Sequence, residues 1–298
     1  MSNEIKIAIV GLDTSHTVEF IRRMQAPDCP VENRVSGMKV VSCLRFETPY
    51  QDAKGLDERQ AQLEQWGVKV TEDFETCVAD CDAIMIEIND ASFHLEYFKK
   101  CVGLGKPIFL DKPLADNIAN GQEIRALATR AGGSVLSSSS LRYAKAVTDA
   151  CDKIPKAQQV STFGPLGIAP AGSSIVWYGV HAFEMLERAM GRGAQTVTVV
   201  KDKGGVVAVV AYDDDRRGTV ELTEGAYQFG GTVRGEGKAA AFVVDGAAIY
   251  TEQLLEIEAF FRTGQSPTCV LDDAVEILAM LDACQKSFDS GKSEPVQA

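Results

Sequence analysis

Three segments of this 298-residue sequence combine polar side chains with a spacing that supports chemistry. They read GLDTSH, INDASFH and DKP, and each directly follows a run of apolar residues. The chain has three histidines: His16 and His94 fall in the first two segments, while His181 lies in the second half. The ordinary pKa of histidine lies near neutrality, so each is a candidate for proton transfer, with a structural role as the open alternative.

The apolar runs before these segments alternate with stretches of helical spacing. We expect strands at 5–11, 38–44, 68–73, 82–88 and 107–113 and helices at 15–25, 57–67, 74–80, 92–105 and 117–133. This alternation predicts right-handed βαβ units and a parallel, Rossmann-like sheet covered by helices on both faces. Such sheets bind ligands beyond the carboxyl ends of their strands, which is where the three polar segments lie.

The pattern changes after about residue 155. Between residues 197 and 246, apolar runs are separated by glycine and aspartate turns with no helical stretch between them, as in consecutive antiparallel strands. Helices are expected again at 252–264 and 271–291. The predicted fold is an α/β Rossmann-like domain over residues 1–120, which binds a dinucleotide. An α+β domain with a large, mostly antiparallel sheet follows over 121–298, for substrate binding and oligomerisation.

The charge balance excludes several classes of partner. The 30 Lys and Arg against 42 Asp and Glu give a formal charge of −12, and no basic patch interrupts it. We therefore expect a small-molecule partner and no nucleic acid or membrane. The first residues lack the pattern of a secretory signal and no apolar run reaches about 18 residues, so a cytoplasmic location is expected. The eight cysteines occur singly, which indicates buried, reduced thiols.

Five motifs follow one another in an informative order. DKPLADNIANGQEIRALATRAG follows DAIMIEINDASFH, and SVLSSSSLRYAKAV, GVHAFEMLERAMG and EIEAFFRTGQSP come later. Together they resemble the Gfo/Idh/MocA dehydrogenases, the family of glucose-fructose oxidoreductase and inositol dehydrogenase. DKPLA is similar to the family's EKPLA motif, and GVHAFE is similar to its GxHxxD helix. The resemblance covers nearly the whole chain.

This resemblance implies an NAD(P)-dependent oxidoreductase that transfers a hydride to or from a carbinol or carbonyl of a sugar, cyclitol or related polyol. It places Lys112 near the substrate hydroxyl and the nicotinamide, and His181 at the position of the proton-transfer residue. The chemistry agrees, because a histidine can accept the hydroxyl proton while a lysine ammonium stabilises the developing alkoxide. The family commonly pairs its antiparallel sheets face to face, so a homodimer or homotetramer is expected.

The first loop departs from the family's GxGxxG pattern. Gly11 is kept, but Asp13 stands at the second glycine position and His16 at the third. A carboxylate beside a pyrophosphate is repulsive unless it turns away or caps the next helix. Asp13 and Thr14 could cap a helix that begins around Ser15, whose free amides would still face an anion. These five residues are the predicted pyrophosphate-binding loop.

The ribose end of the cofactor site is ambiguous. Arg45 stands about where the family has an acidic residue for the ribose 2′-hydroxyl, and arginine suits the 2′-phosphate, so the sequence favours NADP over NAD. Glu47, two residues later, could instead hold the ribose of NAD. Asn89, His94 and Asp111, at the ends of the two later strands, are expected to complete the cofactor site.

The substrate side also departs from the family. Trp177 occupies a position two residues before the glycine of GxH, where the family frequently has aspartate, and Tyr178 follows it. Trp177 could stack on a sugar ring or fill the core, and Tyr178 could act as the acid in place of the absent aspartate. Arg142, beside a run of four serines, could bond to a polyol or a carboxylate.

Two classes of function therefore stay open. The first is the redox enzyme described above. The second is a family member without net redox chemistry, either a lyase or hydrolase that uses histidine and lysine as acid–base groups, or a binding protein. The GLDTSH loop discriminates between them. No metal site is predicted, because the three histidines would have to converge within about 2 Å of one ion.

Overall fold

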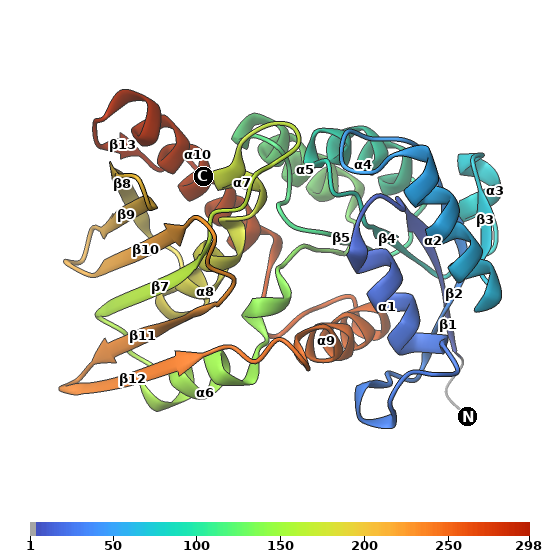
Figure 1. Ribbon diagram of the computed structural model, residues 1–298, viewed down its shortest axis with the longest axis horizontal. Helices are drawn as coiled ribbons and strands as arrows, with labels where there is room; N and C mark the ends of the chain where they lie inside the picture. The colour runs from blue at the N-terminus through green and yellow to red at the C-terminus, as the bar shows by residue number, and fades with distance from the viewer. Residues whose placement is uncertain (1–3) are drawn as a thin grey trace.

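The structure, a computed structural model, describes residues 4–298 and contains two β-sheets with helices packed around them (Figure 1). The sheet built from the first half of the chain stands on the right of Figure 1, and the larger sheet from the second half stands on the left. Helices from the end of the chain lie between the two sheets. The predicted succession of a Rossmann-like domain and an α+β domain is confirmed.

The first sheet is parallel and has the strand order β3-β2-β1-β4-β5-β6. Its strands are β1 (Ile5–Val10), β2 (Met38–Leu44), β3 (Lys69–Thr71), β4 (Ala83–Ile86), β5 (Ile108–Leu110) and β6 (Val135–Leu136). All residues of β4 and β5 are buried, because helices cover both faces of the sheet, and this explains their uninterrupted apolar sequences. The strand order reverses between β1 and β4, so a ligand site is expected at their carboxyl ends.

The helices of this half connect the parallel strands. They are α1 (Ser15–Gln25), α2 (Ala53–Gln65), α3 (Phe74–Val78), α4 (His94–Val102) and α5 (Ile118–Ala131), with the 3₁₀ helices η1 (Val31–Asn33) and η2 (Ala91–Phe93). Side chains of Thr14, Asp52, Asp73 and Asn117 accept a backbone N–H at the start of α1, α2, α3 and α5. The first of these caps sets the start of α1 directly after the GLDTSH loop.

The parallel sheet continues past residue 120, where the sequence analysis placed the domain boundary. A boundary there would divide α5, and β6 pairs with β5 through Val135 and Leu136. The short apolar stretch before the serine run is thus the sixth strand of the first sheet. Its two residues were too few to give a periodic signal.

The second sheet has the strand order β12-β11-β7-β10-β9-β8-β13. Its strands are β7 (Gln159–Pro165), β8 (Ala194–Lys201), β9 (Gly205–Tyr212), β10 (Arg217–Thr223), β11 (Gly230–Gly235), β12 (Lys238–Val243) and β13 (Glu294–Pro295). Neighbours are antiparallel except β7 and β10, which are parallel. The predicted strands lie between residues 197 and 246, so β7, near the middle of the sheet, was missed.

One face of this second sheet is covered and the other is open. The helices of this half are η3 (Ser140–Arg142), α6 (Lys145–Lys153), α7 (Ser174–Trp177), α8 (Val180–Met190), α9 (Ile249–Thr263) and α10 (Leu271–Ser290). Helices α6, α8 and α10 contact the sheet strands. Within residues 4–298 no helix covers the other face. Val200 (66% exposed) and Val243 (60% exposed) belong to strands of that sheet.

Helices from the end of the chain tie the two halves together. α9 contacts α1, and its Leu254 and Ile257 share a core with Ile7 and Ile9 of β1. α10 contacts both α5 and α8. These contacts fix the carboxyl ends of the parallel strands relative to α8. All eight cysteines are buried free thiols, as predicted. In the described chain, none of the helices has the length and apolar character needed to traverse a bilayer.

Candidate active site between the two domains

Several contacts join the carboxyl ends of the parallel strands to the second domain. The indole Nε1 of Trp177 donates to Asn89 Oδ1 at 2.9 Å, and the Tyr50 hydroxyl donates to the carbonyl of Ala171 at 2.7 Å. Lys112, after β5, lines a small cavity together with Glu184 of α8 and other residues. The loops after β4 and β5 and the start of α8 therefore border one interdomain site, as expected for ligands at a switch point.

Position 11 in the first loop accommodates only glycine. Its φ is +114°, and a Cβ built on it would lie 2.2 Å from the carbonyl oxygen of Glu87. Thr14 caps α1 by accepting the N–H of His16 at 3.2 Å, while Ser15 is exposed. The predicted cap by Thr14 is confirmed. The first N–H groups of α1, which have no intrahelical partners, follow directly.

Asp13 turns its carboxylate toward the loop after β4. Its Oδ1 accepts the N–H of Asn89 at 2.9 Å, and its Oδ2 accepts the N–H of Asp90 at 3.3 Å and the hydroxyl of Thr48 at 2.7 Å. The side chain is 1% exposed. Because these donors share its negative charge, the carboxylate need not repel a pyrophosphate at the start of α1. Asp13 thus ties the first loop to the loop after β4.

His16 lies beneath the cleft, against two carboxylates. Its Nδ1 is 2.7 Å from Asp111 Oδ2, and its ring packs against the rings of Phe20 and Tyr250. Burial would raise the pKa of Asp111, but the charge and hydrogen bond of His16, together with Lys112, hold that pKa below its usual range. Glu87 completes the group, and burial followed by the charge of Asp111 raises its pKa well above the usual value.

His94 and Arg45 are engaged within the first domain. Both ring nitrogens of His94 face carbonyl oxygens, Nε2 at 2.7 Å from Ile88 and Nδ1 at 3.3 Å from Leu114, and the residue is fully buried. It therefore bridges the segments after β4 and β5. The Arg45 guanidinium lies 2.6 Å from Asp57 and donates to Gln60 of α2, which gives it partners other than a 2′-phosphate. Cofactor contacts by both residues stay predictions.

Lys112 and His181 approach each other across the cleft. Burial, and next the positive charge of Lys112, hold the pKa of His181 well below its usual range. His181 Nδ1 is 2.7 Å from Ser139 Oγ, which also accepts the N–H of Leu141 at 3.2 Å. Within residues 4–298, Lys112 Nζ and His181 Nε2 make no hydrogen bond to the protein. Both groups are therefore available to a ligand, and His181 is neutral at pH 7.

Trp177 and Tyr178 form an aromatic wall on the second-domain side. The Trp177 ring lies 5.5 Å from Tyr50 and 5.2 Å from Tyr178, measured between ring centroids. Tyr178 in turn lies 5.2 Å from the ring of His181. Trp177 borders a cavity of about 200 Å³ against the loop after β4 and another of about 500 Å³ toward the second sheet. A third cavity, of about 640 Å³, is lined by none of the predicted site residues.

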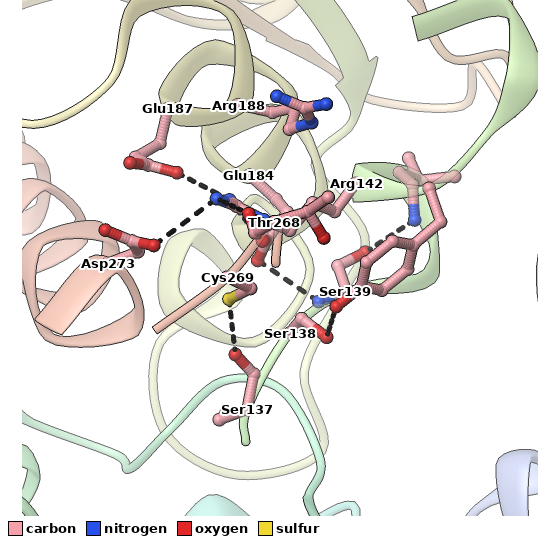
Figure 2. Close-up of polar contacts among 12 residues, drawn as sticks. Ser137, Ser138, Ser139, Arg142, Glu184, Glu187, Arg188, Thr268, Cys269 and Asp273 are labelled. Carbon is pink, nitrogen blue, oxygen red and sulfur yellow. Dashed lines mark hydrogen bonds and ion pairs between the residues drawn. The ribbon is translucent and has the colours of Figure 1, made fainter. Parts of the chain in front are cut away.

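Arg142 does not reach the cleft. It is 3% exposed, and its guanidinium is surrounded by Glu184, Glu187, Asp273 and the carbonyl of Thr268 (Figure 2). Nε and Nη2 donate to the carbonyl at 3.0 and 2.8 Å, and Nη1 donates to Glu184 at 3.1 Å and to Glu187. With all three nitrogens occupied, Arg142 has a structural position, and the structure gives no support to its predicted contact with substrate.

The Arg142 cluster supports the catalytic candidate. Glu184, held by Arg142, accepts the N–H of Ser139 through its other carboxylate oxygen at 3.1 Å, and Ser139 bonds to His181. Burial raises the pKa of Glu184 to about 7, and the charge of Arg142 offsets only part of that effect. Arg142 and Glu184 are thus positioning residues for His181.

Most predicted site residues lie around one cleft. They are Gly11, Asp13, Thr14, His16, Asn89, Asp111, Lys112, Trp177, Tyr178 and His181. The three histidines do not gather at one point, and among residues 4–298 the group with metal-ligand spacing is His16, Glu87 and Asp111. Glu87 was missed by the sequence analysis. Its signal was a lone charge inside the apolar run IMIEI.

The fold and the cleft define a two-domain protein of the Rossmann type with polar loops at the switch point of its parallel sheet. Residues 47–138 match the model of the Gfo/Idh/MocA family, described as an oxidoreductase family with an NAD-binding Rossmann fold. Over these residues the chain is similar to the family, as the INDASFH and DKP motifs indicated. The match begins after the unusual first loop and ends just after β6. No curated protein matches the chain.

Solved structures with the same fold align with nearly the whole chain. GenD2 from gentamicin A biosynthesis, in complex with NAD, is 15% identical with a TM-score of 0.81, covering 100% of this chain and 98% of that one. Myo-inositol 2-dehydrogenase from Lactobacillus plantarum is 17% identical with a TM-score of 0.79, covering 99% and 100%. Myo-inositol dehydrogenase from Lactobacillus casei, in complex with NAD(H) and myo-inositol, is 13% identical with a TM-score of 0.80, covering 99% and 97%. At these identities the likeness establishes the fold.

Proposed function

We propose that this protein is an NAD(P)-dependent oxidoreductase that transfers a hydride to or from a carbinol or carbonyl of a sugar, cyclitol or related polyol. One observation supports the proposal: Lys112, which follows β5, acts electrostatically on His181 and lines one cavity with Val180 and Glu184 of the same helix. The parallel sheet that carries Lys112 lies in the segment that matches an NAD-binding oxidoreductase family. Dehydrogenases of myo-inositol with the same fold support the substrate class.

The two residues have complementary tasks. A bound nicotinamide would accept or supply the hydride. His181, neutral because its pKa is low, accepts the hydroxyl proton of the carbinol, and this role requires the tautomer with hydrogen on Nδ1. Ser139 Oγ holds that tautomer by accepting the Nδ1 hydrogen along with the N–H of Leu141. Lys112 Nζ stabilises the negative charge that develops on the substrate oxygen.

The first loop fits a dinucleotide despite its lack of the second glycine. The carboxylate of Asp13 is bound by Asn89, Asp90 and Thr48, and α1 begins two residues later. The start of an 11-residue helix then offers amides to a pyrophosphate. We propose NAD over NADP, in contrast to the expectation from the sequence, because Arg45, the candidate for a 2′-phosphate, already pairs with Asp57.

We expect the protein to bind NADH saturably, and NADPH about tenfold or more weakly, since a 2′-phosphate would have to compete with Asp57 for Arg45. Trp177 beside Asn89 provides the signal, so the measurement is quenching of protein fluorescence and energy transfer to the reduced nicotinamide. NAD and NADP are titrated by the same quenching.

A Trp66→Phe variant is the matched control, because it leaves Trp177 as the remaining tryptophan of the chain. Its signal should retain the wild-type dissociation constant. Absence of a saturable response to all four dinucleotides up to about 1 mM would contradict the oxidoreductase proposal. It would favour instead the non-redox alternative, a lyase, a hydrolase or a binding protein.

We further propose that the protein forms a homodimer or homotetramer through the open face of its second sheet. Phe163 of β7, Val200 of β8, Val209 of β9 and Val243 of β12 are 36–66% exposed. Val209 pairs with Thr198 on one side and Thr219 on the other, so its side chain lies near the centre of that face. Exposed apolar side chains on several strands of one sheet face are typical of a protein interface.

Light scattering at micromolar concentration should therefore give a mass at least about twice the 32.1 kDa of one chain. A Val209→Asp variant should dissociate, because it places a charge at the centre of the apolar face. Val31→Asp is the control, since Val31 is 81% exposed in the first domain. A wild-type mass near 32.1 kDa would refute this interface.

A further inference from the structure

Three side chains beneath the cleft have the arrangement of metal ligands. His16 comes from the first turn of α1, Glu87 directly follows β4, and Asp111 directly follows β5. One potential ligand atom from each lies within 4.8 Å of the others, and exposures are 6% for His16, 0% for Glu87 and 1% for Asp111. Three elements distant in sequence thus aim polar atoms at one buried point.

Three of the four carboxylate oxygens in this group have no hydrogen-bond partner among the described residues. Within residues 4–298, both carboxylate oxygens of Glu87 and Oδ1 of Asp111 are buried without a hydrogen bond. Leaving a buried carboxylate unsatisfied is among the most costly arrangements in a protein interior. The Lys112 ammonium contributes positive charge nearby, but within residues 4–298 it makes no hydrogen bond or ion pair with either carboxylate. The unpaired oxygens therefore point to a ligand that accepts their electron pairs.

We propose that His16, Glu87 and Asp111 bind one divalent transition-metal ion. One imidazole nitrogen and two carboxylates suit such an ion, and the two negative charges balance it. Ligand atoms around a tetrahedral ion lie roughly 3.4 Å apart at metal–ligand distances of about 2.1 Å, so side-chain movements of about an ångström would close the site. Three protein ligands leave one coordination position for water or another ligand.

The site goes beyond the proposed oxidoreductase activity, which requires no metal. It lies next to the candidate active site, because His16 and Asp111 both act electrostatically on His181. The His16–Asp111 distance of 2.7 Å shows that two of the three ligands already meet without an ion. Glu87 is the diagnostic residue, since both of its oxygens lack protein partners.

The test is a titration of the chelator-treated, full-length protein with Co²⁺ in the absence of any dinucleotide. Visible absorption follows coordination of the cobalt, and competition with Zn²⁺ by calorimetry gives stoichiometry. We expect one saturable site, and we expect Glu87→Gln to weaken it by about 100-fold or more. Glutamine keeps the shape of the side chain and is uncharged, and burial already disfavours the charged form of Glu87, so this variant should stay folded by near-ultraviolet circular dichroism.

Glu96→Gln serves as the matched control, because Glu96 is an exposed carboxylate paired with Lys100 on α4. It should bind Co²⁺ like the wild type. Absence of saturable binding by the wild type up to about 1 mM, or equal binding by Glu87→Gln, overturns the proposal. Dinucleotide binding is measured separately on the same samples, so failure of the metal site is distinguishable from failure of the oxidoreductase proposal.

Discussion

The Arg142→Met variant should lose about 3–5 kcal/mol of unfolding free energy at pH 8. Arg142 is 3% exposed and bonds to Glu184, Glu187 and the Thr268 carbonyl. Methionine fills part of the volume of the arginine side chain. It leaves the carboxylates of Glu184 and Glu187, each 2% exposed, without the cation that balances their charge. Urea denaturation followed by circular dichroism measures the loss.

The deficit of Arg142→Met should shrink as pH falls toward 5. Glu184 already has a pKa of about 7 in the folded protein, above the ordinary 4.5, so its folded state keeps a proton that the unfolded chain releases. A group with a raised folded pKa stabilises the fold below its unfolded pKa and loses that contribution as pH rises through the folded pKa. Without Arg142, the folded-state pKa of Glu184 should rise further, because the guanidinium no longer counteracts the effect of burial. The stability of the variant should therefore depend more strongly on pH than that of the wild type.

Two further variants show whether the stability lost in Arg142→Met comes from the burial of the ion pairs and from the charges left unpaired. Arg192→Met removes another partner of Asp273, but Arg192 is 50% exposed, so the loss should stay below about 1 kcal/mol. Adding Glu184→Gln and Glu187→Gln to Arg142→Met should recover part of the lost stability, because it removes the uncompensated charges. An Arg142→Met variant within about 1 kcal/mol of the wild type would show that the cluster is not a major source of stability.

The parts of the fold that the sequence predicted are those governed by local patterns. The strands β1, β2 and β4 are runs of apolar residues, and the cap of α1 is a threonine just before a helical stretch. The short β6 and the β7 strand gave weaker signals. β7 ends in a glycine and a proline and pairs with β10 and β11 from much later in the chain, so its place in the sheet depends on long-range partners.

In the candidate site, too, the sequence predicts what depends on local patterns and misses what depends on residues far apart in the chain. The position of Lys112 after a parallel strand predicted its place in the cleft, because all parallel strands end at one edge. The direction of the Asp13 carboxylate depends on Thr48 and Asn89, which are 35 and 76 positions away. Arg142 next to four serines resembles a surface segment, and its burial depends on carboxylates at 184, 187 and 273. Such pairings leave no local pattern.

The prediction with the largest effect on chemistry concerns Lys112 and His181. Lys112→Met and His181→Gln should each lower turnover of a polyol such as myo-inositol by about 100-fold or more, with dinucleotide affinity nearly unchanged. Each variant removes a group that acts on the substrate proton or oxygen. Asp13→Ala should instead weaken dinucleotide binding, because it releases the loop after β4 from the first loop.

Titration of the histidines provides a readout of the same pair without turnover. The chain has three histidines, so their ring signals can be assigned by single substitutions and followed by nuclear magnetic resonance. In the wild type, His181 should titrate well below the usual histidine range. Lys112→Met should raise the pKa of His181, because the ammonium disfavours the imidazolium, and the acid limb of the rate profile should move up with it. An unchanged His181 pKa in Lys112→Met, together with near-normal turnover by His181→Gln, would show that these residues do not act as a pair on the substrate.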